Sequence, residues 1–253
     1  MNSVALGVIV FVCLFAAALV GRALRYRLPA EHLSDESKDV IKLATAVVGT
    51  LSALALGLLV ATAKSALDGA AAELRNSAAH IVLLDRVLAH YGPETKEARD
   101  ELRRVMETHL STNWDTGALV SNGNSPDDDT GIEPVQDLLR GLTPKTDAQR
   151  WLLTRALDVS GQIAEAHWLL VEVGDESLPR PFLVIMVTWL SVLFATFGLL
   201  SPRNPTVLLV LVVCAMSVAG AVFLITDMAN PFRGVIYISE QPLRDALAQL
   251  GRS

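Results

Sequence analysis

The residues best placed to do chemistry lie in one apolar stretch, residues 40–63, and their types suit the passage of ions rather than the making of bonds. Hydroxyl side chains within the stretch can contact a hydrated ion. Bulky leucines can form a narrow neck that blocks ions when its water leaves. With one glycine, these side chains make up the candidate pore-lining residues: Thr45, Gly49, Ser52, Leu51, Leu54, Leu58 and Leu59.

Small side chains form a second pattern in the same stretch. They recur at every fourth position, at Gly49, Ala53, Gly57, Ala61 and Ser65. A stripe of this kind lets another membrane helix approach closely. We therefore expect the first four to be helix-packing residues. Their partner is either a helix of a neighbouring subunit or, as the alternative, a helix of the same chain.

No pattern of catalytic residues accompanies the pore-lining candidates and the stripe of small residues. The sequence has no glycine-rich phosphate loop, no nucleophile elbow, no Cys-His pair and no HExxH spacing. We therefore expect the protein not to be an enzyme, and we expect it to hold no cofactor and no metal.

Three further groups of polar residues have two interpretations each. His109 and His167 fall on the core faces of two expected soluble helices. We interpret them as core residues, with a role as metal ligands as the alternative. The run 127–129 of three aspartates lacks the glycine and glutamate of an EF-hand, so we interpret it as a solvated loop. Asp227, at a membrane edge, either faces a pore mouth or stabilises the following turn through backbone N–H groups.

The elements that must position these residues are four long apolar runs, at about 4–20, 40–63, 181–200 and 207–226. The second run has Lys42 at its edge, and the other three contain no charged residue. A helix needs roughly 17–25 apolar residues to cross a bilayer. Charges at that depth cost several kcal/mol each, so their absence indicates four membrane spans.

The segment between the second and third runs is acidic and polar. Residues 64–179 contain 11 Lys and Arg and 20 Asp and Glu, so this insert has a net charge of −9, whereas the whole chain has −6. Binding to nucleic acid needs a basic surface that displaces counterions from phosphates. The composition therefore excludes nucleic acid as a partner and indicates a water-soluble insert.

Helical periodicity runs through this insert. Its first part carries apolar residues at alternating spacings of three and four, an uninterrupted heptad seam that should continue the second span as one helix until Gly92 and Pro93. The seam consists of Leu67, Ala70, Leu74, Ser77, Ile81, Leu84, Leu88 and Tyr91. We expect it to pack against helices at about 94–114 and 145–173, with a short helix at about 133–142.

The sequence thus predicts an all-α integral membrane protein with four transmembrane helices, in two pairs, and a soluble helical bundle. The expected segments are 1–63 with the first two spans, 64–179 with the insert, 180–229 with the last two spans, and a tail at 230–253. Basic residues follow the first span and occur in the link at 201–205, but they also flank the opposite ends of the spans. We expect a multi-pass protein of the cell inner (plasma) membrane. The basic residues do not decide on which side of the membrane the insert lies.

A motif at the end of the fourth run resembles a known family. The run ends in an acidic residue, followed by Pro-Phe-Arg-Gly at 231–234, a short apolar stretch and a Ser/Pro tail. With Leu178-Pro179 before the third run and the glycine-rich second run, this pattern is similar to the bestrophin-like membrane domain family of bacteria and plants. The resemblance covers essentially the whole chain, and it implies two pairs of helices around a soluble helical insert.

The resemblance also implies a function. Bestrophins are oligomeric ion channels whose second helix lines the pore, which here corresponds to residues 45–63. We therefore expect a homo-oligomeric channel in the lipid bilayer that conducts inorganic ions through an apolar constriction. The alternative is a non-conducting membrane sensor or scaffold whose soluble bundle binds a protein or a small molecule.

Overall fold

The computed structural model describes residues 3–29, 34–112, 131–175, 180–202, 204–229 and 235–251, with residues 170–175 and 180 described as backbone only. Most residues in these ranges are helical and none of them is in a strand, which confirms the all-α prediction. Helices α1 (Ser3–Arg27) and α2 (Asp35–Tyr91) are followed by η2 (Pro93–Thr95), α3 (Lys96–Thr112), α4 (Glu133–Arg140), α5 (Asp147–Asp175), α6 (Arg180–Leu200), α7 (Pro205–Met228) and α8 (Gln241–Gln249).

The chain divides into two compact units, and each unit is made of two separate stretches of sequence. The membrane unit comprises Met1–Ser65 and Ser177–Asn230, and the soluble unit comprises Ala66–Glu176 and Pro231–Ser253. Helix α2 has residues in both units. The sequence analysis treated the tail at 230–253 as a segment of its own, whereas the structure assigns its described residues to the soluble unit.

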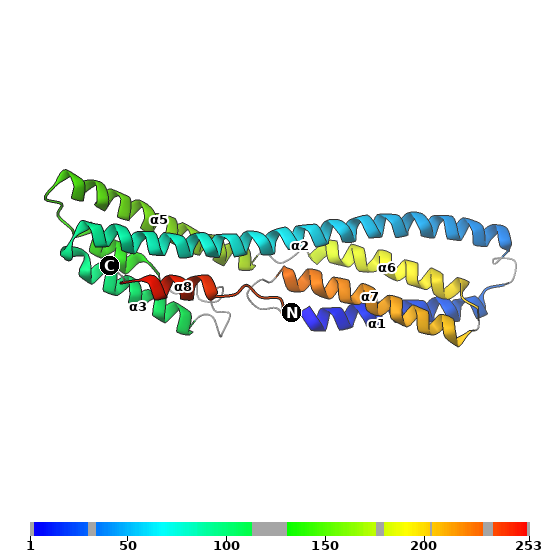
Figure 1. The fold of residues 1–253 in the computed structure, drawn as a ribbon. Coiled ribbons are helices and arrows are strands. Elements are labelled where there is room, and N and C mark those ends of the chain that lie inside the picture. The colour runs from blue at the N-terminus through cyan, green and yellow to red at the C-terminus, as the bar shows by residue number, and fades with distance from the viewer. Residues whose placement is uncertain are drawn as a thin grey trace. The chain divides into compact units, whose positions relative to one another are not determined.

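The membrane unit contains the four expected spans. Helices α1, α2, α6 and α7 are each long and apolar enough to cross a bilayer. Within this unit α1, α6 and α7 run side by side along the first half of α2 (Figure 1). They share an apolar core that includes Leu14 of α1, Leu59 of α2, Met186 of α6 and Val222 of α7. The protein is therefore a multi-pass membrane protein with four spans.

Helices α1 and α6 approach each other more closely than side chains would allow. A Cβ atom built on Gly21 of α1 would overlap the Ala195 carbonyl oxygen of α6. A Cβ built on Gly198 of α6 would overlap the Ala18 carbonyl oxygen of α1. Glycine at both positions is therefore required by the packing, because any side chain would force the two backbones apart.

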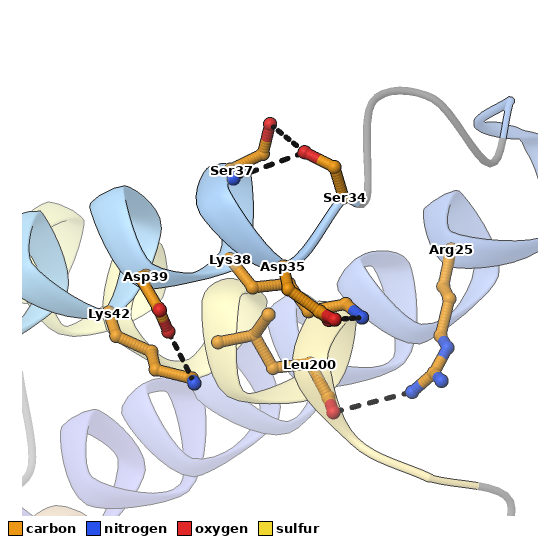
Figure 2. A network of polar contacts seen from close by, with 8 residues as sticks. All are labelled: Arg25, Ser34, Asp35, Ser37, Lys38, Asp39, Lys42 and Leu200. Carbon is orange, nitrogen blue, oxygen red and sulfur yellow. Dashed lines mark hydrogen bonds and ion pairs between the residues drawn. The ribbon is translucent and has the colours of Figure 1, made fainter.

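Polar contacts stabilise the helix ends at one edge of the membrane unit (Figure 2). The Ser34 hydroxyl accepts a hydrogen bond from the Ser37 backbone N–H at 3.2 Å, so Ser34 is the N-cap of α2. The Arg25 guanidinium of α1 donates to the carbonyl oxygens of Leu200, at 3.3 Å, and of Ser201. Arg25 thereby satisfies orphan carbonyls at the C-terminal end of α6, where a cation is favoured.

Acidic side chains in the first turns of α2 form two ion pairs along the same helix (Figure 2). Lys38 Nζ lies 2.9 Å from Asp35 Oδ1, and Lys42 Nζ lies 2.9 Å from Asp39 Oδ1. Both pairs are well exposed to solvent, so each contributes little to stability. The pair with Asp39 does place a negative charge beside Lys42 at the edge of the apolar run.

Helix α2 continues from the apolar run into the soluble unit without interruption, as the heptad seam predicted. It is 57 residues long, which corresponds to about 85 Å at 1.5 Å per residue. Leu84, in the middle of the seam, is fully buried. The helix ends at Gly92, whose φ of 135° is a conformation that favours glycine. The buried Thr95 hydroxyl then contacts the Leu88 carbonyl oxygen at 2.6 Å.

The core of the soluble unit is formed by the α2 seam together with α3, α4, α5 and the tail. It contains Leu102 of α3, Leu139 of α4 and Ile163 of α5, in agreement with the predicted packing of the seam. Helix α8, which the sequence analysis did not predict, lies along α3 (Figure 1). Four residues of the tail enter the core: Ile238, Leu243, Ala246 and Leu250.

Some of the sequence-based predictions concern residues outside the described ranges. These are the aspartate run at 127–129, the Leu-Pro pair at 178–179, Arg203 in the 201–205 link and the Pro-Phe-Arg-Gly motif at 231–234.

Candidate functional site

The candidate pore-lining residues of α2 do not share one face of the helix. Ser52 and Leu59 are 2% and 6% exposed, because they point into the core formed with α1, α6 and α7. The Ser52 hydroxyl donates to the Val48 carbonyl oxygen at 2.8 Å, so its proton is used by the helix itself. Within the single chain, Ser52 and Leu59 therefore face the interior of the membrane unit.

Thr45 is half-buried and has the same backbone bond. Its Oγ1 donates to the Ile41 carbonyl oxygen at 2.6 Å. The two hydroxyls of α2 that were expected to contact ions thus donate their protons to carbonyls of their own helix. Each hydroxyl oxygen can still accept a hydrogen bond from a ligand.

Leucines dominate the opposite, outer face of α2. Leu51, Leu54 and Leu58 are 49%, 72% and 62% exposed within the single chain. In the most apolar 18-residue window of α2, 11% of the residues are buried, compared with 22–28% in the other three spans. Helix α2 is therefore the span whose apolar surface is least covered by its own chain.

The small-residue stripe turns from one face of α2 to the other. A Cβ on Gly49 would lie 3.8 Å from Leu193 of α6, whereas a Cβ on Gly57 would meet nothing within 4 Å. Ala53 and Ala61 are exposed. The reason is geometric: four residues turn the helix by about 400°, so a four-residue repeat drifts by about 40° per step. Beyond Gly49 the stripe is open in the single chain.

Asp227 is buried at the end of α7. It is 1% exposed, beside Thr226, which is 7% exposed. The carboxylate is therefore enclosed by the single chain instead of lying on an open surface. The turn that it was expected to stabilise, at 231–234, lies outside the described residues.

The soluble unit holds a buried ion pair that the sequence analysis did not identify. Asp85 of α2 is 2% exposed, and its Oδ1 accepts from Arg99 Nε of α3 at 2.7 Å. Its Oδ2 accepts from Arg99 Nη2 at 3.2 Å and from the Gly251 backbone N–H at 3.3 Å. The hydrogen bond that Arg99 donates to Asp85 raises the pKa of the Arg99 guanidinium. This carboxylate thereby ties α3 and the tail to α2.

The two histidines that were assigned to core faces meet at a small cavity in the soluble unit. The ring centroids of His109 and His167 lie 5.9 Å apart. The cavity has a volume of about 70 Å³, and Ser77 and Glu133 are also in its lining. Within the described ranges, no three His, Cys, Asp or Glu side chains are placed to hold a metal ion together.

Comparison with known proteins identifies the family to which the chain belongs. A family model described as a Bestrophin-like domain matches residues 12–243. No curated protein matches the chain, and no solved structure matches it. The match extends from the first span to α8, and it includes both units described above. The chain therefore belongs to the bestrophin-like family.

Proposed function

We propose that the protein is a homo-oligomeric ion channel of the cell inner membrane, in which the outer face of α2 lines the pore. The observation that carries this proposal is the exposure of Leu51, Leu54 and Leu58 on the span least covered by its own chain. Membership of the bestrophin-like family supports it. Inorganic ions would be the substrates, and lipid would surround the remaining spans.

The arrangement of α2 suggests how subunits would meet. Gly57 and Leu58 are consecutive, so they lie about 100° apart around the helix. When the small face around Gly57 packs against a neighbouring subunit, the leucine face turns toward a common axis. Small residues permit the close approach, and the leucines of several subunits then form a ring.

Such a ring would control ions by excluding water. An ion in a narrow apolar neck loses its hydration and finds no ligand to replace it, so the neck closes when it dries and opens when it widens. The hydroxyls of Thr45 and Ser52 offer no proton to an anion, because both donate to backbone carbonyls of α2. Leu51, Leu54 and Leu58 are therefore the proposed constriction.

Ion flux into liposomes tests the proposal. We expect Leu51→Ser, Leu54→Ser or Leu58→Ser, at the position that forms the neck, to raise flux because a hydroxyl keeps the neck wet. Leu209→Ser is the matched control, since Leu209 of α7 is 64% exposed on a span assigned to lipid, and flux should not change.

One result would reject the channel. If liposomes with the wild-type protein and with all three variants stay as tight as protein-free liposomes, for both cations and anions and across pH, the pore is absent. The protein would then be the non-conducting sensor or scaffold.

A further inference from the structure

Three arginines lie in the last turns of α1, directly after its apolar run: Arg22, Arg25 and Arg27. Among the residues that the structure describes, the side chains of Arg22 and Arg27 form no ion pair and no hydrogen bond. Arg25 uses only Nη1 for its bonds to the carbonyl oxygens of Leu200 and Ser201, so Nε and Nη2 keep protons to donate (Figure 2). These cations have no role in the proposed channel.

Arg22 and Arg25 lie beside the last turn of α6. They are three residues apart and are therefore neighbours on the surface of α1. A Cβ built on Gly198 of α6 would lie 3.0 Å from the backbone nitrogen of Arg22, which places Arg22 at the close crossing of the two helices. Gly198 is two residues before Leu200, so this contact lies about 3 Å before the end of α6 along its axis. Both arginines are half-buried in the single chain, and both leave α1 at this end of the crossing.

The edge of the membrane unit around these arginines has an excess of positive charge. Lys38 and Lys42 are paired with Asp35 and Asp39, each at 2.9 Å, so the charges of these four residues cancel (Figure 2). Glu36 is the remaining carboxylate in the first turns of α2. Across the described ends of α1, α2, α6 and α7, the three arginines thus outnumber the unpaired carboxylates. The edge therefore attracts anions.

We propose that Arg22 and Arg25 bind the phosphate of an anionic phospholipid at the membrane surface. A guanidinium group presents parallel N–H donors that match two phosphate oxygens. Long basic side chains near the end of a membrane helix extend toward the lipid headgroups. A lipid with a net negative charge is favoured over a zwitterionic one, because the positive edge repels the ammonium group of the latter. The site does not depend on whether the protein conducts ions.

The apolar part of the same lipid has a surface next to the arginines. Leu19 and Phe15 precede Arg22 by three and seven residues, so they lie on the same face of α1. Leu19 is 43% exposed, and Phe15 is half-buried and stacked on Phe11 with ring centroids 6.1 Å apart. An acyl chain along this face would contact these side chains while the phosphate contacts the arginines. Inorganic phosphate has no acyl chain, so it should bind much more weakly than the lipid.

Titration with lipid tests the site on the full-length protein in neutral detergent. Phosphatidylglycerol should raise the melting temperature with saturation, by roughly 5–10 °C at a hundredfold excess over Kd. Phosphatidylcholine or inorganic phosphate at the same concentration should cause no comparable shift. Arg22→Gln should move the midpoint of the phosphatidylglycerol titration to a roughly fivefold higher concentration, since one basic side chain near a lipid surface contributes about that factor.

Lys42→Gln is the matched control, because it removes the same charge from the same edge at a residue that is already paired with Asp39. Its titration midpoint should stay near that of the wild-type protein. A wild-type protein that shows no saturable shift with phosphatidylglycerol, or an equal shift with phosphatidylcholine, would overturn the proposal. So would equal weakening in Arg22→Gln and Lys42→Gln, because binding would then depend on net charge alone.

Chemical modification of the wild-type protein tests the same contacts if the variants do not fold. Phenylglyoxal reacts with accessible arginine side chains, and mass spectrometry reports the extent at each position. Phosphatidylglycerol should protect Arg22 and Arg25 and leave the modification of Arg244, an exposed arginine of the soluble unit, unchanged. Equal modification of Arg22 and Arg25 with and without phosphatidylglycerol would reject the site.

Discussion

Gly21 of α1 lies directly against the Ala195 carbonyl of α6, and no atom larger than hydrogen fits between the two backbones. The reverse contact, from Gly198 to the Ala18 carbonyl, lies about one turn away in the same crossing of α1 and α6. This pair of glycines fixes how the first and third spans pack in the membrane unit.

Gly21→Ala should destabilise the protein strongly. The added methyl group overlaps backbone rather than a flexible side chain, so the two helices must separate along their contact. Overpacking costs about 1–3 kcal/mol in well-packed cores, and we expect a loss at or above the upper end of that range. The measurement is thermal unfolding in detergent. Gly220→Ala is the control, because a Cβ on Gly220 of α7 meets nothing within 4 Å, and an equal loss in both variants would contradict the prediction.

Gly57→Leu should lower the oligomer mass of the detergent-solubilised protein without lowering the stability of the single chain. Outside its own helix, no described atom of the chain lies within 4 Å of a Cβ at this position, so we expect the effect to come from a neighbouring molecule. Light scattering coupled to size exclusion measures the mass. Gly220→Leu of α7 serves as the comparison, since its Cβ position is equally open. An unchanged mass in Gly57→Leu would remove the small face of α2 from the proposed subunit contact.

Asp85→Asn should destabilise the soluble unit by about 3 kcal/mol, because removing one partner of a buried ion pair leaves the other charge uncompensated. The asparagine also offers one acceptor oxygen in place of the two that now serve Arg99 and Gly251. Chemical denaturation monitored by circular dichroism gives the loss. The double variant Asp85→Asn/Arg99→Gln should lose less than the sum of the two single variants. Additive losses would show that the pair is not coupled.

Thr95→Val should lower stability by about 1–2 kcal/mol. Thr95 is 1% exposed, and its hydroxyl lies 2.6 Å from the Leu88 carbonyl oxygen and 2.8 Å from that of Gly92. Valine has the same shape but leaves these carbonyls without that donor at the end of α2. Thr95→Ser, which keeps the donor, should recover most of the loss in thermal unfolding. A serine variant as unstable as the valine variant would assign the effect to packing.

The continuity of α2 and the packing of its seam could be predicted from the sequence, because both depend on local periodicity. Leu74, Ile81, Leu84 and Leu88 recur at heptad spacing, and a run without proline or a cap gives the helix no reason to stop at the membrane. Burial of these side chains in the structure confirms that reading.

The partners of the spans could not be predicted in this way. Periodicity shows that Gly57 belongs to a stripe of small residues, but it does not show what faces the stripe. Gly21 and Gly198, which do form a close helix contact, are single glycines in apolar runs. The signal that was available is Ala-x-x-Gly at Ala18 and again at Ala195, a short form of the same small-residue pattern.

Helix α8 was missed although its sequence carried a signal. Pro242 stands at the first turn, where proline is favoured, and Leu243, Ala246 and Leu250 follow at spacings of three and four. The segment is short, with 9 residues, so its periodic pattern covers fewer than three turns. The approach of His109 to His167 depends on how α3 and α5 are aligned, which no local pattern encodes.

The division of each unit into two stretches of sequence also sets an order of assembly. The seam of α2 is synthesised before α6 and α7, yet Leu243, Ala246 and Leu250, which complete its core, are synthesised after them. Until then the nascent soluble bundle presents an unfilled apolar groove. Because long-lived apolar surfaces promote aggregation, we expect slow insertion of the last two spans to increase aggregation of this chain. A chain that stalls between α5 and α8 is thus open to capture by chaperones and proteases.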